Sequence, residues 1–147
     1  MADEAGALSF DKQICFSLYS ASNAMIRAYR PLLKSLDLTY LQYIVMMVLW
    51  EEQGITVSSL GDKLHLDSGT LTPLLKRLDS KGLVIRQVSD KDERVKRLFL
   101  TDAGFALKAQ ASSIPEKILC KTGVPLATLL QLKTQCDQLL EAFDEAP

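Results

Sequence analysis

The cysteines are the residues of this chain best suited to covalent chemistry, because the thiolate of cysteine is a strong nucleophile. There are three of them, Cys15, Cys120 and Cys136, so they cannot all pair within one chain. No two of them have C-x-x-C spacing, and His65 is the only histidine, so we expect no metal site and no cofactor. The alternative for each cysteine is a small apolar residue of the core, and we expect this for Cys136.

Cys15 lies in a stretch whose spacing places aromatic hydroxyls on one face of a helix. At 100° per residue, Cys15, Tyr19 and Tyr29 fall within an arc of roughly 80°, which is either a polar and aromatic stripe or ordinary core. Cys15 and Tyr29 would be about 21 Å apart along the axis, so they cannot touch within one helix. If two copies of the helix cross antiparallel about a twofold axis, Cys15 of one copy meets Tyr29 of the other.

Positive charge is concentrated in the middle of the chain, although the net charge of the whole is −1. Residues 62–97 carry nine Lys and Arg against six Asp and Glu. This pattern is typical of a nucleic-acid-binding surface, and chance clustering on a solvated surface is the alternative. No apolar run approaches the roughly 18 residues of a membrane span, and the acidic N-terminus is not a secretory signal. We therefore expect a cytoplasmic protein that does not bind a membrane.

The apolar periodicity predicts mainly helices. Their expected ranges are 8–36, 40–53, 56–64, 68–82, 102–120 and 125–144. Pro31 predicts a break or kink in the first helix, and Pro115 predicts a bend in the fifth. Thr39 and Asp67 are suited to cap the helices that follow them. Residues 83–88 and 95–100 are rich in apolar and β-branched residues and flank a polar turn, which predicts a β-hairpin.

A short helix, a tight turn, a second helix and a hairpin make a winged helix-turn-helix. The fold class is therefore mainly α with a small β-hairpin wing, in a single domain over residues 1–147. We expect residues 55–100 to bind DNA. One recognition helix gives little affinity, whereas two placed roughly 34 Å apart read a palindromic site. This requires a homodimer, for which the helices within residues 8–36 and 102–144 offer apolar surface.

The second helix of the motif begins with small hydroxylated residues, Ser68, Thr70 and Thr72, which can approach base edges or phosphates in the major groove. Lys76 and Arg77 follow a turn or more later and are suited to phosphate contacts. The alternative is an amphipathic helix whose polar face is merely solvated.

The polar turn of the hairpin adds a second basic feature. Arg94 lies where a wing could place a guanidinium in the minor groove, which attracts arginine where it is narrow. Asp92 is two residues away and could orient that guanidinium through a forked contact.

This arrangement, with Asp92-Glu93-Arg94 in the wing, resembles the MarR family of regulators. Residues 15–33, 38–52 and 66–78 closely resemble the organic-hydroperoxide-sensing branch of that family, the OhrR repressors. The resemblance covers essentially the whole chain and is strongest over residues 13–80. The cysteine near the start of the first helix, together with LDSGTLTPLLKRL, is more specific than the wing signature alone.

The resemblance implies a repressor that binds the operator of a peroxidase gene when reduced and releases it when an organic hydroperoxide oxidises Cys15. It implies that Tyr19, Tyr29 and Tyr40 surround the Cys15 sulfur, where phenol hydroxyls stabilise a thiolate. It also implies that Cys120 is a resolving cysteine, and we favour pairing with Cys15 of the other subunit.

Three alternatives remain at this point. The first is a MarR-type regulator controlled by a small aromatic ligand in the interface cleft, with Cys15 incidental. The second is a thiol peroxidase using Cys15 and Cys120, although no reductant site is visible and we do not expect an enzyme. The third is a protein-interaction module that uses a winged domain without DNA.

Overall fold

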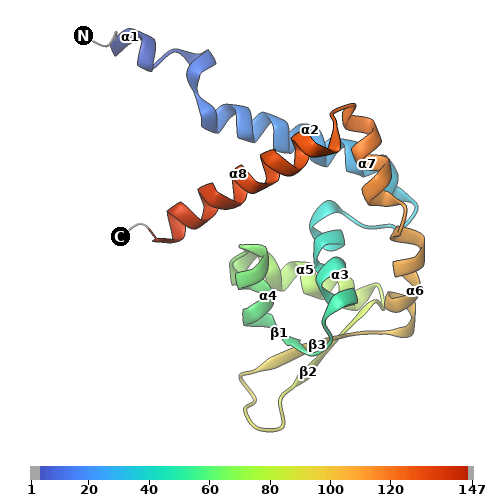
Figure 1. Ribbon diagram of the computed structural model, residues 1–147. Coiled ribbons are helices and arrows are strands. Elements are labelled where there is room, and N and C mark those ends of the chain that lie inside the picture. The colour runs from blue at the N-terminus through green and yellow to red at the C-terminus, as the bar shows by residue number, and fades with distance from the viewer. Residues whose placement is uncertain (1–3, 146–147) are drawn as a thin grey trace. The chain divides into compact units, whose positions relative to one another are not determined.

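The computed structural model describes residues 4–145, so the two ends of the predicted domain 1–147 lie outside the described residues. The chain forms two compact units, the first ending at Ser112 and the second beginning at Ser113. The first unit (Figure 1) contains α1 (Glu4–Ala7), the 3-10 helix η1 (Phe10–Lys12), α2 (Ile14–Lys34), α3 (Tyr40–Glu51), β1 (Ile55–Thr56), α4 (Val57–Leu64), α5 (Ser68–Ser80), β2 (Val84–Val88), β3 (Lys96–Leu100) and α6 (Asp102–Ala111). The second contains α7 (Ile114–Thr122) and α8 (Leu126–Glu145).

The first long helix, α2, starts later than the sequence predicts. Gln13 has extended backbone angles and separates α2 from η1, so the predicted helix over 8–36 is wrong at its N-terminal end. Pro31 lies inside α2 and does not end it, so of the predicted break or kink the break does not occur. The helix ends instead at a turn in which Asp37 has a φ of 52° and the Leu38 N–H donates to the Leu33 carbonyl.

Side-chain caps fix where the helices of the winged unit begin. Thr39 caps α3 in a reciprocal capping box with Gln42, and Asp67 caps α5 by accepting from the Thr70 N–H, as the sequence predicts. Thr101 caps α6 by accepting from the Gly104 N–H. Each cap satisfies a backbone donor that a helix start leaves unpaired.

The wing is the outer part of a three-stranded antiparallel sheet in the order β1-β3-β2. The predicted hairpin is confirmed, with Val84 opposite Leu100 and Val88 opposite Lys96. β1 was not predicted, and it adds Ile55 opposite Leu98 on the other edge of β3. In Figure 1 the hairpin tip extends beyond the helices of the first unit, to which it belongs.

The core of this unit lies between α3, α4, α5 and the sheet. Its most deeply buried large side chains are Leu33, Met46, Leu49, Leu60, Leu71, Leu75, Leu78 and Leu98. Gly104 of α6 packs tightly against the turn that precedes β2, because a Cβ there would lie 2.3 Å from the Leu83 carbonyl oxygen. The sole tryptophan, Trp50, donates from Nε1 to the Gly104 carbonyl at 2.9 Å, which ties α3 to α6.

The predicted helix over 102–120 is two helices, because α6 ends at Ala111 and α7 starts at Ile114. Pro115 lies in the first turn of α7, where its missing N–H costs nothing, so it starts a helix rather than bending one. Ile114 and Ile118 of α7 are buried, whereas α8 has no buried side chain.

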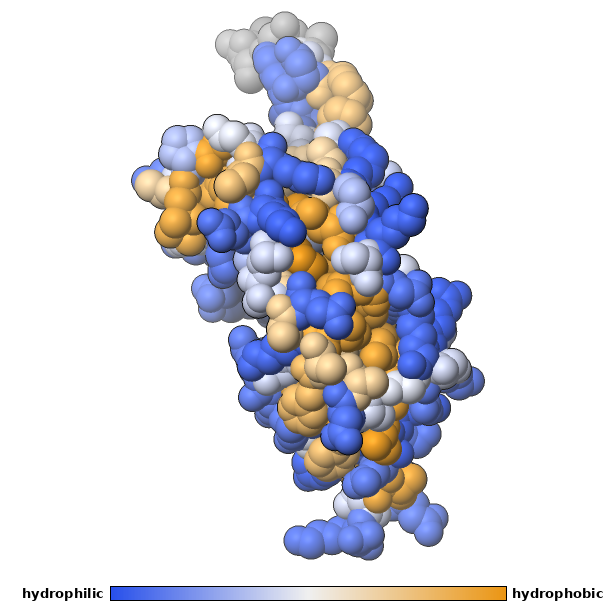
Figure 2. Space-filling view, turned by 90° about the vertical axis from the view of Figure 1, so that its right-hand side faces the viewer, coloured by the Kyte–Doolittle hydropathy of each residue, from blue (hydrophilic) through white to orange (hydrophobic). Residues whose placement is uncertain are grey.

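Apolar residues are correspondingly exposed along α8. They are Leu126, Leu130, Leu132, Leu139, Leu140 and Phe143. Hydrophobic side chains also reach the surface on the face of the molecule shown in Figure 2. No helix among the described residues is long and apolar enough to cross a membrane.

Candidate nucleic-acid interface and thiol site

The turn between α4 and α5 is held by its backbone. His65 caps α4 with a φ of 55°, and the Leu66 N–H donates to the Gly61 carbonyl at 2.9 Å. A Cβ on Gly61 would lie 2.9 Å from the Leu66 carbonyl oxygen, so this close approach requires glycine. The turn therefore sets the direction in which α5 leaves α4.

α5 has one buried and one exposed face. Leu71, Leu74, Leu75 and Leu78 are buried, and they fix the rotation of the helix about its axis. All five α5 residues that the sequence predicts for DNA contact are exposed, namely Ser68, Thr70, Thr72, Lys76 and Arg77. The helix thus presents hydroxyls near its N-terminus and cations further along.

The start of α5 also carries a negative charge. The Asp67 carboxylate accepts from the Thr70 N–H at 2.8 Å. Hydrogen bonding to the side chain of Thr70, and then to its backbone, lowers the pKa of Asp67. The cap is therefore ionised at neutral pH. A carboxylate at this position repels phosphates, so it favours ligand groups that donate hydrogen bonds.

The wing tip presents Arg94 to solvent. Its side chain is 92% exposed, and its Nε donates to Asp92 Oδ1 at 3.3 Å. The same carboxylate oxygen accepts from the Arg94 backbone N–H at 3.0 Å. Asp92 therefore accepts a single hydrogen bond from the guanidinium, at Nε, and not the two parallel hydrogen bonds of a forked contact. The predicted forked contact is wrong. The remaining guanidinium donors are left for a ligand.

A groove of about 630 Å³ lies between α4, the start of α5 and the wing. Its lining includes the predicted Ser68, Thr72 and Arg94, so the structure brings these three predicted DNA-binding residues to one groove. Arg86 of β2 also lines the groove and pairs with Asp79 at 3.4 Å. The sequence reading did not single out Arg86, whose only signal is its place in the basic segment.

The thiol of Cys15 is exposed near the start of α2, and Tyr19, one turn further on, is 65% exposed. Tyr29 lies near the other end of this continuous helix, as predicted. Tyr29 and Tyr40 lie together, with ring centroids 5.0 Å apart. Within the chain, the structure therefore pairs two of the predicted tyrosines with each other and leaves Cys15 at the far end of α2.

Tyr43 joins Tyr29 and Tyr40 to form a cluster of three tyrosines. Tyr43, on α3, is buried and has its ring centroid 5.8 Å from that of Tyr29. Burial, with Tyr40 and Tyr43 as neighbours, raises the pKa of Tyr29 to about 12, and burial also raises the pKa values of Tyr40 and Tyr43. All three phenols are protonated donors at neutral pH. The sequence reading missed Tyr43, although its spacing of three residues from Tyr40 is typical of one helix face.

The other two cysteines lie in the second unit. Cys120 is exposed near the end of α7. Cys136 of α8 is half-buried, whereas we expected it in the core. α8 has no buried side chain in this single chain. Among residues 4–145, no cluster of three or more His, Cys, Asp or Glu could hold a metal ion.

Comparisons with known proteins bear on this arrangement of a helix-turn-helix, a wing and a tyrosine cluster. A profile of the family described as "Transcriptional regulator SarA/Rot" matches residues 27–110. The organic hydroperoxide resistance transcriptional regulator of Bacillus subtilis is 42% identical over 138 residues, which cover 94% of this chain and 94% of that protein. The chain belongs to the MarR/SarA family of transcriptional regulators.

Solved structures of a second relative have the same fold. Reduced AbfR bound to DNA is 35% identical, covers 92% of this chain and 94% of its own, and superposes with a TM-score of 0.75. Disulfide-formed AbfR is also 35% identical, with a TM-score of 0.63 over 88% of this chain and 91% of its own. This MarR/SarA family member has the predicted winged helix-turn-helix fold. It is a transcriptional regulator and not an enzyme, so the thiol peroxidase alternative has no support.

Proposed function

We propose that this chain is a cytoplasmic, homodimeric repressor that binds a palindromic operator when reduced and releases it when an organic hydroperoxide oxidises Cys15. The observation that carries the proposal is the pair formed by Tyr29 and Tyr40 at the opposite end of α2 from the exposed Cys15. A second copy crossing antiparallel would bring this pair of phenol donors to the thiol.

DNA binding is proposed for the exposed face of α5 together with the wing. The hydroxyls of Ser68, Thr70 and Thr72 would meet base edges or nearby phosphates in the major groove. Lys76 and Arg77 would contact phosphates, and Arg94, oriented by Asp92, would enter the minor groove. Support comes from the groove that these elements enclose and from the relative AbfR, whose reduced form is bound to DNA in its structure.

The homodimer is supported by apolar surface that one protomer leaves uncovered. α8 buries no side chain, and Leu8, Phe10 and Ile14 before and at the start of α2 are exposed. Covering apolar surface of this kind with a second chain removes it from water, which favours association. We therefore assign dimerisation to residues 8–36 and 102–144 and DNA binding to residues 55–100 within one functional domain.

The proposed chemistry is a two-electron oxidation of sulfur. The Cys15 thiolate attacks the terminal peroxide oxygen, the O–O bond breaks, and the alkoxide that leaves takes up a proton to become the alcohol. The thiolate of Cys120 then attacks the sulfur of the resulting sulfenic acid, so that a disulfide forms as the S–O bond breaks, and the departing hydroxide takes up a proton to become water. We assign Tyr19, Tyr29 and Tyr40 to stabilise the reacting thiolate, because protonated phenols donate hydrogen bonds to it.

A gel-shift titration on the region upstream of the protein's own gene cluster tests this proposal. Reduced wild type should bind, and stoichiometric cumene hydroperoxide should abolish binding in wild type and in Cys136→Ser but not in Cys15→Ser. Loss of binding in Cys15→Ser as well would reject Cys15 as the sensor. Binding that ignores the oxidant in every variant would instead favour a regulator controlled by a small aromatic ligand.

A further inference from the structure

We infer that Lys81 is a positioning residue for operator binding: it ties the C-terminal end of α5 to the turn between α2 and α3 and thereby sets the angle at which α5 meets DNA. The inference rests on the DNA-binding part of the proposed function and not on its redox part. Lys81 lies within the basic segment, where its charge alone would suggest a phosphate contact.

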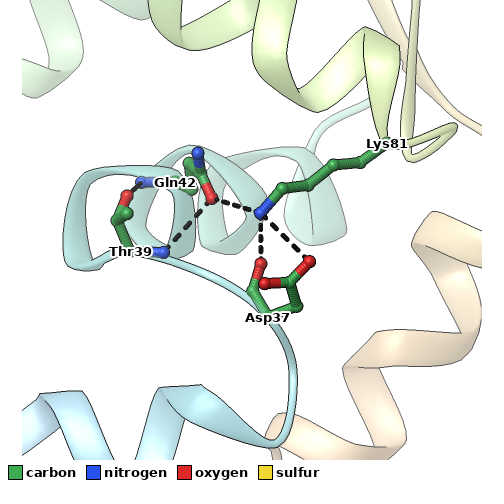
Figure 3. Close-up of polar contacts among 4 residues, drawn as sticks. All are labelled: Asp37, Thr39, Gln42 and Lys81. Carbon is green, nitrogen blue, oxygen red and sulfur yellow. Dashed lines mark hydrogen bonds and ion pairs between the residues drawn. The ribbon is translucent and has the colours of Figure 1, made fainter.

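The Lys81 ammonium group is occupied by protein acceptors. Lys81 is the C-cap of α5, and its side chain is only 29% exposed. Figure 3 shows Nζ donating to the backbone carbonyl of Asp37 and to Gln42 Oε1, the latter at 3.0 Å. The Asp37 carboxylate lies 3.6 Å away, but it is 92% exposed, so this ion pair contributes little. The two neutral oxygens therefore define where the ammonium group sits.

Both neutral acceptors are held in fixed positions. Gln42 is only 3% exposed, and its Oε1 also accepts from the Thr39 N–H at 3.2 Å in the capping box of α3. The Asp37 carbonyl belongs to the turn that ends α2, where Asp37 itself has a φ of 52°. Because neither acceptor can move without disturbing a helix end, the contact transmits the position of this turn to α5.

The geometry of α5 amplifies small movements at this contact. At 1.5 Å per residue, Ser68 lies about 20 Å along the helix from Lys81. A tilt of about 5° about that end would move Ser68 by about 1.7 Å, which is enough to break hydrogen bonds to bases. The turn that Lys81 contacts also leads into Tyr40, whose ring packs against Tyr29. The same contact thus joins the recognition helix to the aromatic cluster.

Salt dependence separates a positioning lysine from one that neutralises a phosphate. Removing a phosphate contact lowers the slope of log K against log salt by about one, whereas removing a positioning contact weakens binding and leaves the slope unchanged. The matched control is Lys63→Met, which removes one positive charge from the same unit. Lys63 forms an exposed pair with Glu52 at 3.8 Å and has no buried acceptor in that contact.

The experiment measures the Kd of each reduced variant across a salt series, on the DNA duplex that reduced wild type binds. The temperature is kept below the thermal unfolding transition of every variant. Lys81→Met should weaken binding at least about fivefold with an unchanged salt slope, whereas any weakening in Lys63→Met, which removes only charge, should come with a lower salt slope. Gln42→Leu should weaken binding similarly, and the double variant should bind no worse than either single variant.

An unchanged Kd in Lys81→Met, a salt slope reduced by about one, or additive effects of Lys81→Met and Gln42→Leu would each overturn the inference. Lys81→Met is the decisive variant, because its side chain reaches the surface and its loss leaves the capping box intact. The redox proposal is judged separately, by whether oxidised wild type releases the same duplex. Its failure would leave the result on reduced protein unchanged.

Discussion

The four tyrosines of this chain occupy different surroundings. Tyr19 is largely exposed on α2, whereas Tyr29, Tyr40 and Tyr43 are wholly or partly buried together. Tyr19, Tyr29 and Tyr40 are proposed to stabilise the Cys15 thiolate, and Tyr43 is not. Tyr43 therefore provides an internal comparison for the role of the phenol group.

Removing one phenol oxygen tests that assignment. Tyr29→Phe and Tyr40→Phe should slow oxidation of Cys15 by about tenfold or more, because a hydrogen bond to a charged group contributes about 1.5–3 kcal/mol. The measurement is the rate of thiol loss with cumene hydroperoxide. Tyr43→Phe is the comparison and should keep the wild-type rate; equal slowing in all three variants would indicate a general packing effect instead.

The pKa of Tyr29 is raised from 10.0 to about 12, so the stability of the fold should fall as the pH becomes alkaline. Below pH 10 the phenol is protonated in the folded and the unfolded chain, so its contribution to stability is fully present. As the pH rises from about 10 to about 12, only the unfolded chain loses the proton, so the folded state loses stability. Thermal unfolding midpoints should therefore fall more steeply over this range in wild type than in Tyr29→Phe.

Caps and local patterns made much of the element layout predictable. Thr39 and Asp67 were identifiable as caps, and α3, α5 and the hairpin follow their predicted ranges closely. β1 has only two residues, too few to show alternation, and it exists because β3 pairs with it. Non-local pairing of this kind leaves no local signal.

The same limit applies to the candidate site. The exposed residues of α5 could be predicted because they follow from helix periodicity and a cap. Lys81 could not, because its acceptors lie about forty residues earlier in the chain. In a basic segment, a lysine held by Gln42 looks the same as a lysine facing solvent until the tertiary structure is known.

The packing of α6 makes a prediction about two glycines. A Cβ on Gly104 would meet the Leu83 carbonyl, so Gly104→Ala should destabilise the fold by about 1–3 kcal/mol, as overpacking does. A Cβ on Gly69, in the first turn of α5, would have its nearest heavy atom, Asp67 Oδ1, at an ordinary contact distance of 3.6 Å. Gly69→Ala should therefore leave the stability of the fold unchanged or raise it by up to about 1 kcal/mol. Urea denaturation compares the two; equal destabilisation would contradict the close contact at Gly104.

The wing makes a prediction about affinity. Arg94→Ala should weaken operator binding and lower the salt slope by about one, because its exposed guanidinium would face the DNA backbone in the minor groove. Asp92→Ala should weaken binding less and keep the slope, because it removes only the orienting contact. Fluorescence anisotropy over a salt series distinguishes them, and an unchanged slope in Arg94→Ala would place the wing away from DNA.

At the scale of the whole molecule, α8 tests the proposed dimer. Leu140 is 45% exposed, so Leu140→Asp should leave the fold of a protomer intact and disrupt association. Losing simultaneous contact with two half-sites should then weaken operator binding about 100-fold or more. Sedimentation velocity reports the association state, with Gln138→Asp as the matched change on the same helix. A monomeric wild type, or a variant that stays dimeric, would reject this interface.

The single tryptophan gives the molecule a built-in optical reporter. Trp50 is fixed by its bond to Gly104, and its ring lies edge-on to Tyr43 at 6.4 Å, at the border of the tyrosine cluster. All indole emission therefore comes from one site that adjoins the proposed sensor. A change in the colour or lifetime of that emission, followed in real time after adding oxidant, would time the structural response without any attached dye.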